Sequence, residues 1–523
     1  MRLRDLAAHL GSPVPAGEDV DITGVEYDSR RVVPGVGPGR GVLFAALPGE
    51  HTDGRLFARD AVARGAVCVL AAEAVEGVDA PLLIVPDVRA AMAEAAGLVY
   101  GDPSGCLKTI GVTGTNGKTT VTYLLESIFR EAGEPVGVIG TVNYRYGALV
   151  LPAPHTTPEA PDLARLLRQM ADGGASGCVM EVSSHALAQK RVEGVRFDAA
   201  VFTNLTEEHL DYHETMEGYY GAKALLFRRH LKRAGEGRAV VNVDDRWGAR
   251  LAAAVGSAGT TTYGLSEGAD VHPLSFDLKG SSTEALVAMG GGKTIKLLST
   301  LVGEYNLYNM LAAAAAADLL GVDPGAIAAG IAALARVPGR LEAVDPGGDV
   351  PFRAYVDYAH TADALKRTLE ALRPVAGGRI ITVFGCGGDR DRSKRPVMGS
   401  VAAAASDLTI ITSDNPRGED PGAIIEEITA GVVEAGGVEM LDGPEALTNG
   451  QRGYSVIPDR HEAISRAVGS AREGDIILVA GKGHEDYQIV GDRRLPFDDR
   501  SVLREAIASR VSGPVRAGGG GGD

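Results

Sequence analysis

Short β-rich runs alternate with helical stretches along most of the chain. From about residue 109 the order is TIGVT, a helix beginning at Lys118, VGVIG, a helix after Pro158, and GCVMEV. A second series begins near Arg353, where apolar-periodic segments separate the runs RAYVDY, IITVFG, LTIITS and DIILVAG. Such alternation is typical of parallel sheets with crossover helices. The sequence therefore predicts two α/β units, the second doubly wound and Rossmann-like.

The first hundred residues differ from these two series. They contain the short runs GVEYDS, VLFAAL, VCVL and LLIV and one helical stretch before Tyr100, which predicts a small α/β domain. An Ala-rich helical segment at 311–335 ends at Val337-Pro338-Gly339-Arg340. A chain of 523 residues is also too long for a single core. We predict an α/β protein with domains at 1–103, 104–340 and 341–515, and a disordered Gly-rich tail at 516–523.

Composition and charge narrow the classes of function. Hydrophobic residues make up 45% and charged residues 23%, as in soluble globular proteins. The net charge of −16 disfavours a nucleic-acid partner, and no run approaches the roughly 20 apolar residues of a membrane span. The four cysteines are scattered without metal-ligand spacing. We expect a cytoplasmic protein that binds small molecules.

The strongest chemical signal is GVTGTNGKTT at 111–120, between a predicted strand and a predicted helix. Backbone N–H groups of such a loop, with the positive end of the helix, can hold a polyphosphate. Lys118 would bridge the terminal phosphates, and Thr119 would offer its hydroxyl to Mg²⁺. Val112 stands where the common P-loop pattern has glycine, so this is a variant P-loop.

Further candidates follow in the same unit. Glu181 lies at the end of a buried strand, where ligands of open α/β sheets collect and where one carboxylate can serve Mg²⁺. The segment Asn204–His213 holds two imidazoles and three carboxylates. Lys223 lies among apolar helix residues, which by itself is typical of a lysine that reaches to solvent.

Three loops of the second series each follow a strand: Gly385–Arg392, Asp414–Arg417 and Gly481–Glu485. Together they offer guanidinium groups and carboxylates at one sheet edge. An amino-acid zwitterion needs both, because arginine binds a carboxylate in a fork while Asp or Glu accepts from an ammonium group. Local salt bridges in ordinary loops are the alternative.

The whole chain except its tail resembles the Mur ligases, and within them those that complete a UDP-muramoyl tripeptide. The motifs are TGTNGKTT at 113–120, HTTP at 155–158, EVSSHAL at 181–187, HLDYH at 209–213, AKALLF at 222–227, GEYNLYN at 303–309, PGRLE at 338–342, DYAHT at 357–361, GCGGDRDRSKRP at 385–396, DNPR at 414–417 and GKGHE at 481–485. The resemblance implies three domains, which bind the uridine nucleotide, ATP and the incoming amino acid in that order.

The resemblance also implies roles for single residues. ATP contacts are implied for Gly114, Thr115, Asn116, Gly117, Lys118, Thr119, Thr120, Asn306, Asn309, Arg340 and Asp357. UDP-muramoyl-dipeptide contacts are implied for Ser29, Arg30, Thr156, Thr157, Ser183, Gln189 and Arg191. Contacts to meso-diaminopimelate are implied for Arg390, Asp414, Asn415, Arg417, Gly481 and Glu485. The implied metal ligands are Thr119, Glu181, His209 and Lys223, the last as a carbamate (N6-carboxylysine), and the implied catalytic residues are Lys118, Lys223, His209, Arg340 and His360.

The implied activity is an Mg²⁺- and ATP-dependent ligation in peptidoglycan precursor synthesis. It would add meso-diaminopimelate to the D-glutamate of the dipeptide through an acyl phosphate, in a protein that we expect to be a monomer. One departure is Glu208, which stands where the family usually has Asp. The alternatives are a ligase that adds lysine, a folate-polyglutamate-type ligase, and a nucleotide-binding regulatory protein without catalysis. HTTP and DNPR disfavour folate, and the joint presence of Lys118, Glu181, His209 and Lys223 disfavours a dead site.

Overall fold

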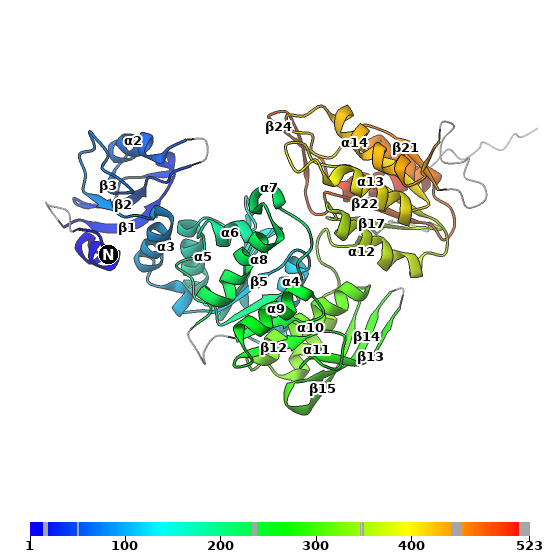
Figure 1. The fold of residues 1–523 in the computed structure, drawn as a ribbon, viewed down its shortest axis with the longest axis horizontal. Helices are drawn as coiled ribbons and strands as arrows, with labels where there is room; N and C mark the ends of the chain where they lie inside the picture. Colours follow the sequence, from blue (N-terminus) through cyan, green and yellow to red (C-terminus); the bar gives the residue numbers. More distant parts are fainter. Residues whose placement is uncertain are drawn as a thin grey trace, which may run out of the picture.

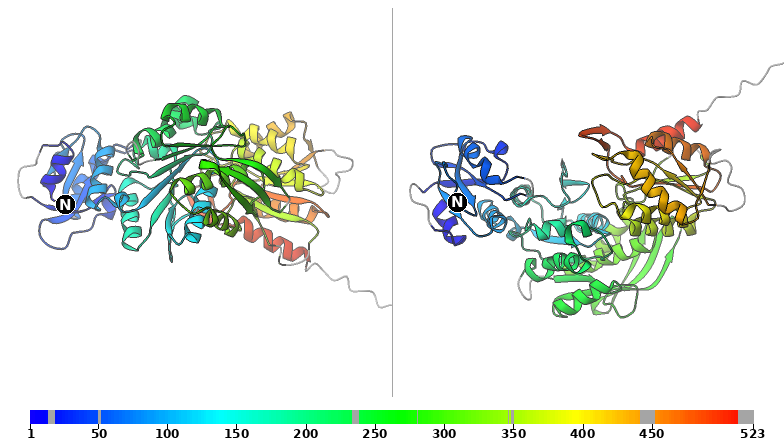
Figure 2. Two further views of the ribbon diagram at one scale, coloured as in Figure 1. Left: turned by 90° about the horizontal axis from the view of Figure 1, so that it is seen from below. Right: turned by 45° about the horizontal axis from the view of Figure 1, so that its top comes forward.

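The computed structural model describes residues 1–13, 19–49, 52–232, 238–279, 281–345, 347, 350–440 and 452–511. Three lobes follow one another along the chain, and the central lobe lies between the other two (Figure 1). Each lobe has its own sheet and its own helices (Figure 2). The predicted α/β class with three domains is therefore confirmed. The Gly-rich tail lies outside the described residues.

The N-terminal lobe is built on a four-stranded parallel sheet in the order β1-β2-β3-β4. Its strands are β1 (Asp21–Glu26), β2 (Arg40–Ala45), β3 (Ala66–Ala71) and β4 (Leu82–Ile84), with helices α1 (Leu3–His9), α2 (Ala58–Ala63) and α3 (Val88–Val99). β3 is apolar at every position, and apolar clusters lie on both faces of the sheet. Such continuous apolar strands are typical of parallel sheets that are covered on both sides.

The central lobe contains an eight-stranded sheet in the order β12-β11-β10-β5-β9-β6-β7-β8. The parallel strands are β5 (Lys108–Thr113), β6 (Val136–Ile139), β9 (Gly177–Glu181), β10 (Ala199–Phe202), β11 (Arg238–Asn242) and β12 (Thr260–Tyr263), and β7 (Asn143–Tyr146) and β8 (Leu149–Pro152) form an antiparallel extension. The helices are α4 (Lys118–Glu131), α5 (Ala160–Asp172), α6 (Ser184–Ala188), α7 (Leu210–His213), α8 (Met216–Leu225), α9 (Arg246–Val255), α10 (Glu304–Leu319) and α11 (Pro324–Ala333). Separate apolar clusters, one around α4, α10 and α11 and one around α5 and α8, cover the sheet.

Two features of the central lobe differ from the expectation. A three-stranded antiparallel sheet, formed by β13 (His272–Leu278), β14 (Thr283–Met289) and β15 (Lys293–Ser299), was not predicted. The Ala-rich segment is two helices instead of one, because Asp323 caps a new helix that begins at Pro324. Proline suits the first position of a helix, where its missing N–H has no partner to lose.

The C-terminal lobe has a seven-stranded sheet in the order β16-β17-β22-β18-β19-β21-β20, in which only the β16-β17 pair is antiparallel. The strands are β16 (Glu342–Ala343), β17 (Arg353–Asp357), β18 (Ile380–Phe384), β19 (Leu408–Ile411), β20 (Val438–Glu439), β21 (Gly453–Val456) and β22 (Ile476–Ala480). Helices α12 (Ala362–Leu372), α13 (Lys394–Ala405) and α14 (Pro421–Glu434) pack with one apolar cluster, and α15 (Arg460–Ser470) and α16 (Asp499–Val511) with another. A hairpin of β23 (Tyr487–Val490) and β24 (Arg493–Pro496) lies outside this sheet.

The central and C-terminal lobes meet at the segment that follows α11. A Cβ atom at Gly339 would lie 2.2 Å from the backbone nitrogen of His484, so the two loops are in close contact. This contact brings Arg340, from the end of the central lobe, next to the loop that follows β22. Among the helices that the structure describes, none is both long and apolar enough to cross a membrane.

Candidate active site

The P-loop joins the end of β5 to the start of α4, as predicted. Gly117 caps α4 with a φ of 90°, and Gly114 has a φ of 145°. A Cβ atom at Gly114 would lie 1.9 Å from the hydroxyl of Thr203, so only glycine fits there. The backbone N–H of Asn116 donates to the side chain of Asn204 at 3.0 Å. The loop is thus held tightly and places the positive end of α4 at its centre.

Lys118 folds back over this loop. Its Nζ donates to the carbonyl oxygens of Gly114 at 2.9 Å and Thr115 at 2.7 Å. Burial lowers the pKa of Lys118, although Glu208 and Glu181 act in the opposite direction. Within the described residues, Lys118 forms no ion pair with a carboxylate. This ammonium group is therefore suited to an anionic ligand in the loop.

Thr119 and Glu181 lie side by side. The Thr119 hydroxyl donates to Glu181 Oε1 at 3.0 Å, and Glu181 also accepts from the backbone N–H and the hydroxyl of Thr141, each at 2.9 Å. Among the described residues, no group of three or more His, Cys, Asp or Glu side chains is placed to hold a metal. One hydroxyl and one carboxylate nevertheless fit Mg²⁺, which prefers oxygen ligands and takes the remainder from water and phosphate.

Lys223 is buried, with only 1% of its surface exposed, so the apolar helix pattern taken alone, which is typical of a lysine that reaches solvent, was misleading. Its Nζ donates to the carbonyl oxygen of Gly114 at 2.8 Å and lies 4.6 Å from the ring centre of Tyr219. Burial lowers the pKa of Lys223 well below its ordinary value, and nearby Lys118 adds to the effect. Position on an apolar helix could not reveal this, because Lys223 faces the P-loop, which is distant in sequence.

His209 belongs to a group of aromatic rings next to Lys223. Its ring centre lies 4.7 Å from that of His185 and 6.0 Å from that of Tyr219. Burial lowers the pKa of His209 to about 4, although Glu208 favours the charged form. The imidazole is therefore neutral at pH 7, which is the form that can donate its lone pair to a metal.

Arg340, at the end of the central lobe, and side chains of the C-terminal lobe complete this site. The Arg340 guanidinium donates to the Thr119 hydroxyl at 3.0 Å and lies 4.5 Å from the ring centre of Tyr358. Asp357 accepts from the backbone N–H groups of Leu341 at 2.5 Å and Ala359 at 2.8 Å. These contacts place Arg340, Asp357 and the following residues directly opposite the P-loop.

Two carboxylates that sequence reasoning did not assign connect the lobes. Glu208 Oε1 lies 3.4 Å from His360 Nε2, and the pKa of Glu208 is strongly lowered because its cationic neighbours outweigh burial. Asp363 Oδ2 accepts from Asn116 Nδ2 at 2.9 Å and from the Thr206 hydroxyl at 3.2 Å. Asp363 follows the DYAHT motif by two residues, and that proximity is the only sequence signal for its role.

A cavity of about 440 Å³ lies between the P-loop and these C-terminal residues. The predicted site residues that line it are Thr115, Asn116, Gly117, Lys118, Thr119, Thr120, Thr156, Glu181, Ser183, His209, Asn309, Arg340, Asp357 and His360. Asn306 lies behind Asn309 and accepts its side-chain N–H at 3.1 Å. Most residues predicted for ATP, and two predicted for the dipeptide, therefore share one cavity.

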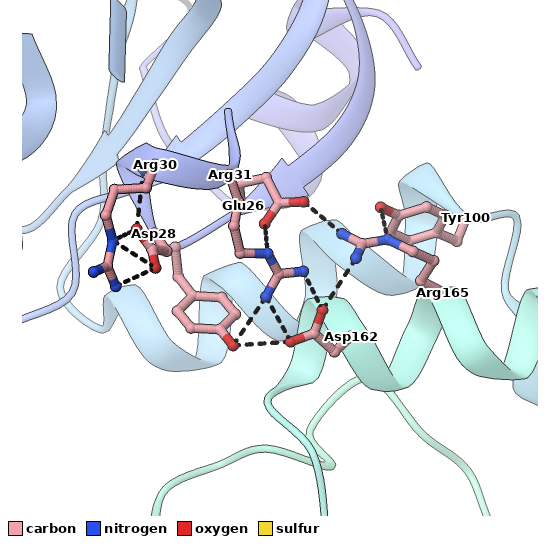
Figure 3. A network of polar contacts seen from close by, with 8 residues as sticks. Glu26, Asp28, Arg30, Arg31, Tyr100, Asp162 and Arg165 are labelled. Carbon is pink, nitrogen blue, oxygen red and sulfur yellow. Dashed lines mark hydrogen bonds and ion pairs between the residues drawn. The ribbon is translucent and has the colours of Figure 1, made fainter. Parts of the chain in front are cut away.

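The other residues predicted for the UDP-muramoyl dipeptide lie in two places. Thr157 accepts from the backbone N–H of Ser183 at 3.1 Å, and Arg191 donates to the carbonyl oxygen of Thr157 at 2.9 Å and to Gln189 at 2.7 Å. Ser29 and Arg30 lie in the N-terminal lobe, where Arg30 is exposed and pairs with Asp28 (Figure 3). The predicted peptide-end and uridine-end contacts are thus in different lobes.

The loops predicted for the amino acid do come together. Lys482 is fully buried and contacts both Asp414 Oδ1 at 3.0 Å and Asn415 Oδ1 at 2.9 Å. Asn415 Nδ2 donates to Glu485 at 3.0 Å, and Arg417 donates to the carbonyl oxygen of Gly388 at 2.8 Å. These residues do not line the cavity described above but lie beside it.

Two further positions describe the shape of this second site. Gly481 has a φ of 113° and lies against Asp414. A Cβ atom at Gly387 would lie 2.8 Å from Arg417 Nη1 and 3.8 Å from Arg390 Cγ, so both arginines border the same glycine. The structure therefore brings all the predicted amino-acid contacts to the carboxyl ends of adjacent strands.

Fully buried Arg395 was not predicted to matter. It donates to Glu419 at 2.8 Å and to Glu427 at 2.9 Å, and also to the carbonyl oxygen of Gly387 at 3.2 Å. Glu419 in turn accepts from the backbone N–H of Asp389 at 2.6 Å. Arg395 thus ties the loop that contains Arg390 to the loop that contains Arg417.

Known protein families match the three lobes of the chain one after another. Three family models match in order: "Mur ligase family, catalytic domain" at residues 21–100, "Mur ligase middle domain" at 112–317 and "Mur ligase, glutamate ligase domain" at 339–483. The chain is similar to two proteins named UDP-N-acetylmuramoyl-L-alanyl-D-glutamate–2,6-diaminopimelate ligase. It is 49% identical to that of Geobacter metallireducens, over 97% of this chain and 98% of the relative. It is 46% identical to that of Gloeobacter violaceus, over 98% and 99%.

A solved structure with the same ligase name is also similar. It superposes with a TM-score of 0.66 at 32% identity, and the match covers 98% of this chain and all of the other. The three lobes and their order are therefore shared along nearly the full length.

Proposed function

The chain belongs to the Mur ligase family, and we propose that it is the ligase that joins meso-diaminopimelate to UDP-N-acetylmuramoyl-L-alanyl-D-glutamate with ATP as cosubstrate. The observation that carries this proposal is the pairing of two sites. A P-loop cavity lined by Lys118, with buried Lys223 on the other side of Gly114, lies next to a second site that offers Arg417 and Glu485. One site suits a polyphosphate and the other suits an amino-acid zwitterion.

We place the domain boundaries at residues 103 and 340. The N-terminal domain would bind the uridine end, the central domain ATP and the C-terminal domain the incoming amino acid. A monomer that acts in the cytoplasm on small molecules is our proposal for its state and location. The division agrees with one sheet in each part, apart from the separate antiparallel sheet of the central domain and the hairpin of the C-terminal domain.

The chemistry that we assign to the cavity begins with phosphoryl transfer. The side-chain carboxylate of D-glutamate attacks the γ-phosphorus of ATP, ADP leaves, and an acyl phosphate forms. Lys118 and Arg340 would stabilise the charge on the transferred phosphoryl oxygens, as positioned cations do in other phosphoryl transfers. The amine of diaminopimelate then attacks the acyl carbon, inorganic phosphate leaves, and the amine gives up a proton. His360 and Asp357 would close the cavity against water.

We assign Mg²⁺ binding to Thr119 and Glu181, with His209 and a carbamate on Lys223 as further ligands. The metal would supply positive charge next to the phosphate oxygens. The lowered pKa of Lys223 favours the neutral amine, which is the form that adds to CO₂ with release of a proton. The resulting carbamate would offer oxygen ligands to the metal, whereas a protonated Lys223 would repel it.

The proposed specificity rests on the far end of the amino acid. Diaminopimelate has a second carboxylate and ammonium group there, and lysine has only the ammonium. Arg417, with Arg390 beside it, can bind the carboxylate, while Glu485 can accept from the ammonium. Lys482 and Asp414 neutralise each other, so they leave Arg417 as the cation available to the ligand.

A phosphate-release assay tests the function. Purified protein is given ATP, Mg²⁺ and UDP-muramoyl dipeptide, together with diaminopimelate, lysine or no amine. We expect release with diaminopimelate that exceeds release with lysine by roughly 10²-fold, because two cationic groups would lose their anion. Equal use of lysine would overturn the specificity, and a folded protein that releases no phosphate with either amine would overturn the function.

A further inference from the structure

A network of charged side chains joins the N-terminal lobe to α5 of the central lobe (Figure 3). Arg31 contacts both oxygens of Asp162, at 2.5 and 3.0 Å, and Arg31 Nε lies 3.3 Å from Glu26. Arg165 contacts Glu26 at 2.6 Å and Asp162 at 3.1 Å. The Tyr27 hydroxyl adds a hydrogen bond to Asp162 at 2.8 Å. Two guanidinium groups and two carboxylates therefore alternate across the boundary.

The network is more enclosed than an ordinary surface pair. The side chains of Glu26 and Asp162 are only 10% and 23% exposed, and those of Arg31 and Arg165 are 36% and 31% exposed. Burial raises the pKa of Asp162, but the hydrogen bonds from Arg31 and Tyr27 outweigh it and leave this pKa below its usual value. Networks of coupled, partly desolvated charges can contribute more than isolated exposed pairs, which contribute little.

A second group of contacts fixes the same two lobes. Arg89 of α3 lies 3.6 Å from Glu159, the residue before α5, and Glu159 lies 3.0 Å from Arg191. Lys190 pairs with Asp87, the capping residue of α3. Apolar residues of α5 join the N-terminal core between these contacts. The N-terminal lobe is therefore attached along α5 and not at one point.

In both lobes this attachment lies next to predicted substrate contacts, the uridine-end contacts in the N-terminal lobe and the peptide-end contacts in the central lobe. Arg31 is the last residue of the short 3₁₀ helix Ser29–Arg31, and its neighbour Arg30 points the other way, toward Asp28 (Figure 3). α5 begins two residues after Pro158, which closes the segment with Thr156 and Thr157. A shift of Arg31 relative to α5 would thus change the distance between the uridine-end and peptide-end contacts.

We propose that Glu26, Arg31, Asp162 and Arg165 are positioning residues that hold the uridine-end and peptide-end contacts at the spacing of the UDP-muramoyl dipeptide. None of the four lines the P-loop cavity. Because they fix the two lobes, binding of the uridine diphosphate in the N-terminal lobe also orients the D-glutamate carboxylate that reacts in the central lobe. Remote binding energy of this kind is lost when the connecting structure loosens. This inference rests on the proposed function.

The test compares two substrates in the full-length protein: UDP-muramoyl dipeptide and the same muramoyl dipeptide without UDP. The variants are Arg31→Met, Asp162→Asn and the double variant. We expect kcat/KM for the UDP-bearing substrate to fall about tenfold in each single variant, a size typical of broken charge networks. We expect kcat/KM for the UDP-free substrate, and KM for ATP, to stay unchanged. The double variant should lose little more than either single variant, because the two residues act through each other.

Asp172→Asn is the matched control. Asp172 lies on the same helix and pairs with Arg168 within that helix, so it makes the same kind of pair without crossing the boundary. We expect its kinetics to equal those of the wild type. Thermal unfolding of all variants separates a local effect from loss of the fold. Small-angle X-ray scattering adds a readout without substrate, in which the two interface variants should show a broader distribution of distances than Asp172→Asn.

The outcomes are distinct. Equal losses on both substrates, or unchanged kinetics and scattering in folded Asp162→Asn, would overturn the positioning role. A wild type with a higher kcat/KM for the UDP-free substrate would also overturn this role, because binding of the uridine diphosphate would then not promote the reaction. A wild type that uses neither substrate would overturn the proposed function, and scattering alone would then decide whether the network fixes the lobes.

Discussion

The P-loop cavity and the amino-acid site hold their enclosed basic side chains in opposite ways. Lys118 and Lys223 donate to backbone carbonyl oxygens and, within the described residues, form no ion pair with a carboxylate. In the amino-acid site, Lys482 pairs with Asp414 and Arg395 pairs with two glutamates. Buried cations without a carboxylate are costly, whereas buried cations with hydrogen-bonded partners are tolerated.

This difference indicates two kinds of specificity. The cavity is lined by groups of both signs, but Lys118 donates to backbone carbonyl oxygens instead of a carboxylate, so its charge remains available to an incoming polyphosphate. The amino-acid site is neutralised internally, so its buried pairs serve to hold loops, and recognition depends on the few groups that remain, above all Arg417. Loss of a residue should therefore stop chemistry in the cavity but change selectivity or stability in the amino-acid site.

The largest effect is expected for Lys118→Ala. Removal of the cation on the transferred phosphoryl group should lower kcat for phosphate release by about 10³-fold, the upper range for loss of one preorganised charge. Circular dichroism should show an intact fold, because the hydrogen bonds of Lys118 within the described residues go to two loop carbonyl oxygens. Lys366→Ala, at an exposed position of α12, is the control. Normal turnover by folded Lys118→Ala would show that this lysine is not the phosphate cation.

Lys223→Ala should reduce activity by roughly 10²-fold or more, since a ligand to the metal is lost. If the missing group is a carbamate, formate or acetate should restore part of the activity by supplying a carboxylate oxygen. In the wild type, ¹³C-labelled CO₂ should give a carbamate signal in the NMR spectrum that is absent from Lys223→Ala. Full wild-type activity after removal of CO₂ would contradict the assignment of a carbamate to Lys223.

Arg417→Ala should alter selectivity more than turnover. The guanidinium is the proposed partner of the second carboxylate of diaminopimelate, so kcat/KM for this amine should fall roughly 10²-fold while that for lysine changes little. Arg250→Ala, on the surface of the central lobe, is the control. An unchanged preference in Arg417→Ala would mean that the site does not read the far carboxylate through this residue, and the contrast between the two sites would lose its main support.

Much of the fold and of the cavity was predictable because the signals are local. The glycines of the P-loop and the helix that begins at Lys118 are adjacent in sequence. Strand β22 is a continuous apolar run, and β18 and β19 are each interrupted by only one threonine. The antiparallel sheet β13–β15 was missed because polar residues stand at several of its positions and β13 is exposed along most of its length. Its presence depends on packing against α11, which no local pattern specifies.

The unpredicted parts of the site depend on contacts between distant segments. Asp363 contacts Thr206, which lies 157 residues earlier in the chain. Arg395 lies in the sequence SKRP, where only the positions of Glu419 and Glu427 reveal that it is buried. The helix pattern around Lys223 is typical of a surface lysine, but in the structure this side chain is buried against the P-loop. Sequence pattern identifies which groups carry charge, but tertiary packing decides which of those charges are buried and paired.

The smallest effect, and the most direct check on internal neutralisation, is expected for Glu419→Gln. Hydrogen bonds from Arg395 lower the pKa of Glu419 from 4.5 to about 2. A carboxyl whose pKa is lower in the folded state stabilises the fold above its unfolded-state pKa and loses this contribution as the pH falls through the folded-state pKa. Wild type and Glu419→Gln should therefore differ by about 1 kcal/mol in free energy of unfolding at pH 7. The difference should shrink between pH 4.5 and about 2.

Urea unfolding of both proteins at pH 7, 5, 4 and 3 measures this difference, and Glu462→Gln, which removes a charge from the exposed first turn of α15, is the control. Glu427 still pairs with Arg395 in the variant, so the loss should stay small. Because Arg395 also holds Gly387 next to Arg417, Glu419→Gln should weaken the preference for diaminopimelate slightly without affecting KM for ATP. If the difference in free energy of unfolding does not change with pH, the ion pair of Glu419 with Arg395 is not its cause. If KM for ATP changes, the ion pairs of the amino-acid site are not independent of the P-loop cavity.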